Sequence, residues 1–304
     1  MNIVIEQIII LYTFILIGLG LGKWKKEQAK NSSLLSFLLV NLFLPIMVFR
    51  SFSRDFTVSY ITENFLTLLI SAGMLLLIIG FASLLSPLFS RDKFQRAVYH
   101  YSLTITNFSY IGFVLAENLL GGVGLANMIL FCIPASLYTY SVGFSTLTGG
   151  GSPVKKLINP ITVAMVLGMI FGLVGIPMPA VVSTILSSAS ACVGPLSMLL
   201  TGFVLAGFKF RQLLPDWRVL LTCLLRLVLL PALVFFLCKG LALFMPLPDA
   251  VYPYAVLFTC LPCGSNTVIF PKLIGKDCDS GARIALYSHL ISCFTIPIWL
   301  GIVL

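Results

Sequence analysis

The sequence predicts an all-α integral membrane protein with ten transmembrane helices. Of its 304 residues, 59% are hydrophobic and only 10% are charged, and the mean hydropathy is +1.07. Soluble domains carry roughly 25% charged residues, so this composition excludes a sizeable soluble domain. The apolar residues fall into ten runs of roughly 20 residues, the length that crosses the hydrocarbon core as a helix. Two of these runs are interrupted near their centres by Pro, Gly and Asn.

The predicted spans divide evenly between the two halves of the chain. The first half contains spans at 3–22, 33–52, 63–86, 97–119 and 124–147, and the second at 159–175, 179–207, 218–244, 251–274 and 281–303. Cations follow the first run instead of preceding it, which is the opposite of a signal peptide. We therefore expect the first run to be a retained span.

Basic residues gather in alternate loops. Loops 1–2, 3–4, 5–6, 7–8 and 9–10 hold 15 of the 19 basic residues: Lys23, Lys25, Lys26, Lys30, Arg91, Lys93, Arg96, Lys155, Lys156, Lys209, Arg211, Arg218, Lys272, Lys276 and Arg283. The opposite side holds Arg50, Arg54 and Lys239. The positive-inside rule then places the first set in the cytoplasm and both termini outside the cell membrane. The net charge of +9 thus indicates a lipid bilayer as partner, and no nucleic acid.

The two halves resemble each other in where their spans are interrupted. Pro45 lies in the second span and Pro195 in the seventh, while the fourth carries Asn107 to Gly112 and the ninth Pro262 to Thr267. An odd number of spans per half requires opposite orientations, so the pattern predicts an inverted repeat of residues 1–148 and 159–304. Residues 149–158 would form a cytoplasmic linker.

Four stretches together resemble the auxin efflux carrier family of permeases, bacterial relatives of the plant PIN proteins within the bile-acid/arsenite/riboflavin transporter group. They are Asn41 to Pro45, Asn107 to Gly112, Asn159-Pro160 with Gly194-Pro195, and Pro262 to Asn266 with Ile296 to Trp299. Two positions depart from the family's pattern. Val114 stands where a Pro is common, and Pro271-Lys272 stand where acidic residues are common.

The resemblance implies a scaffold of spans 1, 2, 6 and 7 and a transport unit of spans 3–5 and 8–10. Spans 4 and 9 would cross at the membrane midplane. The implied function is elevator-type transport of a small organic anion, such as a dicarboxylate or an auxin-like acid, often by a homodimer. The coupling ion is left open between H⁺, Na⁺ and none.

The physics of two broken helices gives the same kind of site. Their half-helix N-termini would present unsatisfied amides and partial positive charge to one point, which suits a carboxylate. We predict Asn107 and Asn266 as principal ligands, with hydroxyls from Thr106, Ser109, Ser265 and Thr267, and helix breaks at Gly112, Pro262 and Gly264. The alternative is that these polar side chains only hydrogen-bond neighbouring helices.

Other intramembrane polar residues have two interpretations each. Asn41 lines the cavity or caps the backbone at Pro45, and Pro45 and Pro195 are scaffold bends more than ligands. Arg226 contacts substrate or snorkels to the cytoplasmic surface. His289 relays protons or only hydrogen-bonds within the bundle. Glu117 is a protonatable carboxylate or an interfacial one.

Two short patterns carry less weight. The pair Cys260 and Cys263 matches C-x-x-C, but no second Cys/His pair accompanies it, so we expect neither a metal nor another cofactor. Gly18-x-x-x-Gly22 and Gly168-x-x-x-Gly172 would allow close helix packing, within the chain or at a dimer contact.

Competing functions remain at this stage. A sodium-coupled bile-acid-type symporter, a channel and a non-transporting membrane sensor would share the polar pathway. A membrane-embedded enzyme would need a constellation of nucleophile, base or metal ligands, and the sequence shows none. It also contains no Walker sequence, so we expect neither catalysis nor ATP hydrolysis.

Overall fold

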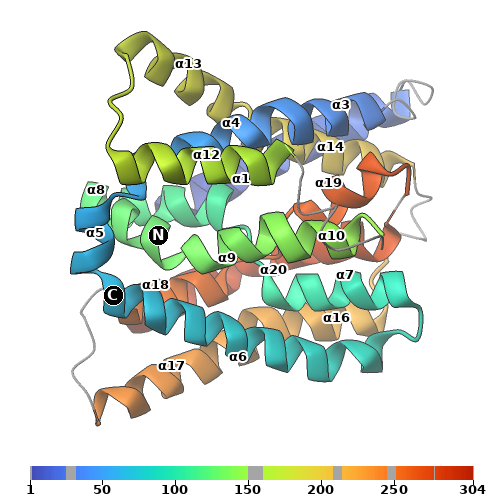
Figure 1. Ribbon diagram of the computed structural model, residues 1–304. Helices are drawn as coiled ribbons and strands as arrows, with labels where there is room; N and C mark the ends of the chain where they lie inside the picture. The colour runs from blue at the N-terminus through green and yellow to red at the C-terminus, as the bar shows by residue number, and fades with distance from the viewer. Residues whose placement is uncertain are drawn as a thin grey trace.

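The computed structural model in Figure 1 describes residues 2–24, 32–149, 160–207, 214–244, 251–276 and 278–303. Within these residues the protein is all-helical, as the sequence predicts. The β-type pairing found there is a single antiparallel bridge between Thr106 and Cys263.

The helices of the first half are α1 (Asn2–Trp24), α3 (Ser32–Leu38), α4 (Leu44–Asp55), α5 (Val58–Glu63), α6 (Phe65–Phe89), α7 (Lys93–Thr104), α8 (Phe113–Phe131), α9 (Ile133–Tyr138) and α10 (Phe144–Leu147). Those of the second half are α12 (Pro160–Val174), α13 (Ala180–Ala191), α14 (Val193–Ala206), α16 (Trp217–Leu224), α17 (Leu230–Ala242), α18 (Val251–Cys260), α19 (Asn266–Leu273) and α20 (Asp279–Val303). Short π-helical turns join several of them: η1 (Leu39–Phe43), η2 (Phe108–Gly112), η3 (Thr139–Gly143) and η4 (Leu225–Leu229).

Five helical stretches of the described chain are long and apolar enough to cross a membrane: Ser33–Arg54, Phe65–Phe89, Ala180–Phe203, Trp217–Ala242 and Asp279–Val303. They match the second, third, seventh, eighth and tenth predicted spans. Shorter apolar helices cover Thr13–Trp24, Pro160–Val174 and Val251–Cys260. The structure therefore supports a polytopic membrane protein, and the count of ten spans as an inverted repeat stays a prediction.

Close packing through glycine joins four of the helices. Helix α1 packs against α14, and α12 packs against α4, with more extensive contact than any other pair of helices in the described residues. A Cβ on Gly202 would lie 2.8 Å from the Cα of Gly18, and one on Gly168 would lie 2.8 Å from the carbonyl oxygen of Phe49. The predicted small-residue packing is thus present, and it lies within the chain.

Figure 1 shows two outer layers of helices with further helices between them. In that view α1, α3, α4, α12, α13 and α14 lie above, and α6, α7, α16 and α17 lie below. Helices α8, α9, α18, α19 and α20 run between the two layers. Both ends of the chain lie at the same end of the molecule. The interrupted segments therefore lie in the middle of the bundle.

Candidate functional site

The two interrupted apolar segments meet in the interior of the bundle. Helix α7 ends at Thr104 and α18 ends at Cys260, and each is followed by a short extended stretch before the chain becomes helical again. The extended stretches pair through the antiparallel bridge between Thr106 and Cys263. The backbone N–H of Asn107 donates to the carbonyl of Pro262 at 2.8 Å, and that of Gly264 donates to Ile105 at 3.2 Å. Each break thus satisfies backbone groups of the other.

Local sequence explains why the chain breaks here. Pro262 has no N–H, so it cannot continue α18 by bonding the carbonyl four residues earlier. Gly264 lies against the other segment, because a Cβ there would come within 3.2 Å of the carbonyl oxygen of Thr106. Segment 105–107 breaks without a proline, even though Val114 stands where a Pro is common in the family. The backbone pairing with Pro262 replaces the helical hydrogen bond of Asn107.

Asn107 is held by a histidine. Its side chain is 2% exposed, and its Nδ2 lies 3.0 Å from Nε2 of His289. The other ring nitrogen, Nδ1, lies 2.6 Å from the carbonyl oxygen of Ala285, which can only accept. Neutral His289 is therefore protonated on Nδ1, and its Nε2 accepts from the amide of Asn107. In this arrangement the amide of Asn107 is committed to His289 and does not face the cavity described below.

Asn266 is held in a comparable way by a tyrosine. Its Nδ2 donates to the hydroxyl of Tyr101 at 3.1 Å, while its Oδ1 has no hydrogen-bond partner among the described residues. The neighbouring hydroxyls are also buried. Thr267 donates to the carbonyl of Gly264 at 3.1 Å, and the Oγ1 of Thr106 finds no partner in the described part of the chain. The polar groups at the two breaks are thus close together but shielded from open space.

A cavity of about 500 Å³ lies between α1, α4 and the α13–α14 break on one side and η2, α8, α9 and η3 on the other. Its lining includes Ile10, Phe14, Met47, Val48, Arg50, Ser51, Phe52, Arg54, Ser109, Phe113, Leu125, Ile129, Ser136, Tyr140, Ser187, Ser190, Ala191, Gly194 and Pro195. These residues combine a broad apolar surface, several hydroxyls and two guanidinium groups, and none of the side chains described in this lining is a carboxylate. A second space of about 280 Å³ shares Arg50 and Arg54.

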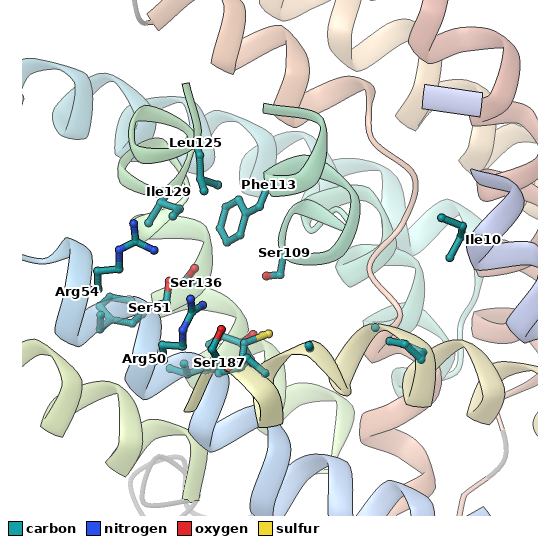
Figure 2. Close-up of a pocket in the computed structure, with 18 of the residues that line it drawn as sticks. Ile10, Arg50, Ser51, Arg54, Ser109, Phe113, Leu125, Ile129, Ser136 and Ser187 are labelled. Atoms are coloured by element: carbon teal, nitrogen blue, oxygen red, sulfur yellow. The ribbon is translucent and has the colours of Figure 1, made fainter. Parts of the chain in front are cut away.

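The polar groups of the cavity come from opposite walls. Figure 2 shows Arg50 and Arg54 extending from α4 into the cavity, while the hydroxyl of Ser109 points in from η2. The hydroxyls of Ser109 and Tyr140 interact, and both line the cavity. Ser109 lies two residues after Asn107, so the cavity reaches the edge of the interrupted segment. Ser109 and Pro195 are the sequence-predicted residues found in this lining.

The arginines were missed as site residues by sequence reasoning. They entered the argument only as charges of a loop on the side with few cations. A signal was nevertheless present, because positions 50 and 54 are four residues apart and therefore share one face of a helix. Two cations on one helix face at the end of an apolar span indicate an anion-binding site more strongly than they indicate solvated charges of a loop.

The structure also shows where the residues with two interpretations lie. Asn41 is exposed, and its Nδ2 donates to the carbonyl of Phe37 at 2.9 Å. Asn41 lies in the π-helical turn η1 that precedes Pro45 and binds the backbone of the preceding helix α3, and it is absent from the cavity lining. Pro195 follows the break between α13 and α14 at Cys192, in keeping with a bend. Glu117 belongs to α8, but its side chain lies outside the described part of the structure.

Arg226 does not snorkel. Its side chain is 0% exposed, and its Nη1 donates to the carbonyl of Leu103 at 2.9 Å. The snorkelling interpretation is wrong because Arg226 lies on the face of η4 that packs inward, whereas Val228 and Leu229 of the same turn are exposed. The guanidinium lies behind the interrupted segments and is absent from the cavity lining.

The two cysteines of the C-x-x-C pattern are free thiols that bond to backbone. The thiol of Cys260 donates to Leu257 at 3.4 Å, and that of Cys263 donates to Ser102 at 3.2 Å. Within the residues that the structure describes, no group of three His, Cys, Asp or Glu side chains could hold a metal ion.

Interrupted apolar helices that meet beside a polar cavity inside a helical bundle define a class of protein, the membrane transporters. Comparison with family models identifies the family. A model described as membrane transport protein matches residues 3–152 and again residues 147–300, which together cover nearly the whole chain. The chain therefore belongs to this membrane transport family, which is of the auxin efflux carrier type and consists of transporters, not enzymes. No match was found among curated proteins.

Proposed function

We propose that the protein is a secondary-active transporter of a small organic anion. The observation that carries this proposal is the cavity of about 500 Å³ whose described lining contains the guanidinium groups of Arg50 and Arg54. A cavity walled by apolar surface focuses the field of its cations and raises the local concentration of anions. Ligand cavities fall in the range of about 300–1,000 Å³, so the volume suits a small organic molecule.

The cavity leads to the interrupted segments. Ser109 joins the two regions, because it lines the cavity and lies in the π-helical turn that begins directly after Asn107. We propose that Arg50 and Arg54 first bind the carboxylate. The carboxylate then replaces His289 and Tyr101 as the hydrogen-bond acceptor of the amides of Asn107 and Asn266. The hydroxyl of Thr106, which has no hydrogen-bond partner among the described residues, can donate to a carboxylate and supports a site whose hydrogen bonding is incomplete without a ligand.

The wider architecture of the proposal follows the family. Ten spans as a 5+5 inverted repeat are supported by the two family-model matches, one on each half. The packing of α1 on α14 and of α12 on α4 supports a rigid scaffold of spans 1, 2, 6 and 7. Spans 3–5 and 8–10 would then move against it as an elevator, in a homodimer embedded in the cell membrane. Both termini would face outside, on the side where Arg50 and Arg54 lie.

Uptake by proteoliposomes tests the proposal. Purified protein would be reconstituted and supplied with radiolabelled carboxylates, malate and malonate first, with and without the same unlabelled anion inside. We expect saturable uptake that internal anion accelerates, because a carrier exchanges faster than it returns empty. Rapid equilibration without such acceleration would indicate a channel, and no uptake of any anion would contradict the proposal.

The variant Arg50→Gln tests in the same uptake assay whether the cavity binds the anion. A hydrogen bond to a charged group contributes about 1.5–3 kcal/mol, so its loss in a partly solvated cavity should raise the half-saturating concentration about tenfold or more. Lys239→Gln is the matched control, because Lys239 lies on the same predicted side but packs over Phe235 and Tyr252. Equal half-saturation in both variants and wild type would show that the cavity does not receive the anion.

A further inference from the structure

Arg226 has the largest fully buried side chain in the described residues. Its Nη1 donates to the carbonyl of Leu103 at 2.9 Å, and its Nη2 reaches the carbonyl of Phe258 at 3.5 Å. The guanidinium also lies 5.8 Å from the centre of the Phe258 ring. No carboxylate of the described chain forms an ion pair with it. A permanent charge is thus buried against backbone carbonyls and an aromatic face.

The two carbonyls are among those that the helix breaks leave without helical partners. In a continuous helix the carbonyl of Leu103 would accept from the N–H of Asn107, but that N–H donates to Pro262 instead. The carbonyl of Phe258 would accept from residue 262, which is a proline and has no N–H. Arg226 therefore bridges one orphaned carbonyl from each interrupted segment.

The electrostatics of this place favour a cation. Leu103 lies in the last turn of α7 and Phe258 in the last turn of α18. The C-terminal end of a helix carries partial negative charge, and here two such ends converge. In transporters with interrupted helices, half-helix C-terminal ends and unwound carbonyls coordinate the sodium ion. The guanidinium of Arg226 contacts carbonyls of this kind with a charge that cannot dissociate.

We propose that Arg226 is a positioning residue that acts as a built-in cation. It binds the orphaned carbonyls of Leu103 and Phe258 and so holds the two breaks together without a bound sodium ion. The proposal deepens the proposed function, since it assigns the crossover a fixed charge in place of a coupling cation. Its prediction is that anion transport by this protein does not require sodium.

Thermal unfolding of the purified full-length protein tests the proposal independently of transport. The unfolding midpoint of wild type should be equal in NaCl, KCl and choline chloride of the same ionic strength. Arg226→Met keeps much of the volume without the charge and should unfold several degrees lower, whereas Arg226→Lys should recover part of the loss. A sodium-specific rise of the wild-type midpoint, or an Arg226→Met variant as stable as wild type, would overturn the proposal.

Rescue by a small cation separates a cation site from a simple packing role. Arg226→Ala opens space at the carbonyls, so millimolar guanidinium chloride should raise its midpoint and leave that of wild type unchanged. Met128→Ala is the control, because Met128 is equally buried and its loss leaves a cavity without orphaned carbonyls. If guanidinium shifts both alanine variants equally or neither, the cation site is refuted. The wild-type comparison of salts decides the question if Arg226→Ala does not fold.

Transport provides the second measurement. For an anion that wild type carries, the initial rate of uptake should be the same with an inward sodium gradient and with N-methyl-D-glucamine in its place. A severalfold stimulation by sodium would overturn the proposal while leaving anion transport established. If no anion is carried, the proposed function fails, and the unfolding experiments still decide whether Arg226 acts as a cation.

Discussion

The closest helix–helix contact that the structure describes in the scaffold offers a sharp test of the packing. Gly202 of α14 faces α1, where an added Cβ would lie 2.7 Å from the backbone nitrogen of Leu19 and 2.8 Å from the Cα of Gly18. Carbon atoms pack best at about 3.5–4.0 Å, so Gly202→Ala would push the helices apart by at least about 0.7 Å. The overlap is with backbone, which has no alternative rotamer to adopt.

The magnitude follows from two opposing effects. Overpacking costs about 1–3 kcal/mol, and the rigid backbone places this site at the upper end. Replacing Gly by Ala within a helix recovers about 1 kcal/mol, which leaves a net loss of about 2 kcal/mol. Gly20→Ala is the matched control in the partner helix, since nothing lies within 4 Å of a Cβ at that position. It should be neutral or slightly stabilising.

The assay is thermal unfolding of the two purified variants in the same detergent, followed by intrinsic fluorescence. A gap of about 2–3 kcal/mol between them corresponds to a few degrees in the unfolding midpoint. Equal midpoints for Gly202→Ala and Gly20→Ala would refute the reasoning, because they would mean that α1 and α14 do not approach each other at Gly18. A loss seen only at protein concentrations that favour dimers would instead place the glycine at a subunit contact.

Two further predictions concern a single hydrogen bond and a single thiol. The indole Nε1 of Trp299 donates at 2.9 Å to the carbonyl of Leu227, which Pro231 leaves without its helical donor. Trp299→Phe should therefore cost about 1–2 kcal/mol in unfolding experiments, and clearly less in a Pro231→Ala background, whereas an equal cost in both would contradict the explanation. Burial raises the pKa of the Cys278 thiol to about 11. At pH 7.5 the folded protein should thus hold roughly 100-fold less thiolate at Cys278 than a thiol of ordinary pKa, and maleimide labelling mapped by mass spectrometry should be correspondingly slow until the protein is unfolded. Fast labelling of the folded protein would show that the thiol is accessible.

Much of the fold could be predicted because its causes are local in the sequence. The length of each apolar run sets the spans, and Pro262 with Gly264 makes a break in the ninth unavoidable. The break at 105–107 could be anticipated only from the repeat, because nothing in its own residues removes an N–H. Its cause is the carbonyl of Pro262, which lies 155 positions further along the chain and accepts from Asn107.

The site was harder to predict because side-chain partners are non-local. The structure places Asn107 and Asn266 at the two interrupted segments, as predicted, but no sequence pattern indicates that His289 and Tyr101 bind their amides. Arg226 showed the opposite difficulty. Its position within the span suggested access to the surface, whereas the direction of a side chain depends on which face of the helix packs inward. That direction follows from the contacts of η4 with α7 and α18.

Prolines and the carbonyls they orphan connect these observations. Inside a membrane bundle bulk water does not reach such a carbonyl, and a side-chain donor is one of the groups that can satisfy it. Here Pro262 orphans Phe258, which Arg226 approaches, and Pro231 orphans Leu227, which Trp299 binds. The indole of Trp299 donates to one carbonyl. The guanidinium of Arg226 lies where two carbonyls from two half-helices converge, because a cation with several donors matches both the charge and the geometry there. In the described residues the fixed charge of Arg226 therefore lies where the two interrupted segments converge, as our proposal of a built-in cation requires.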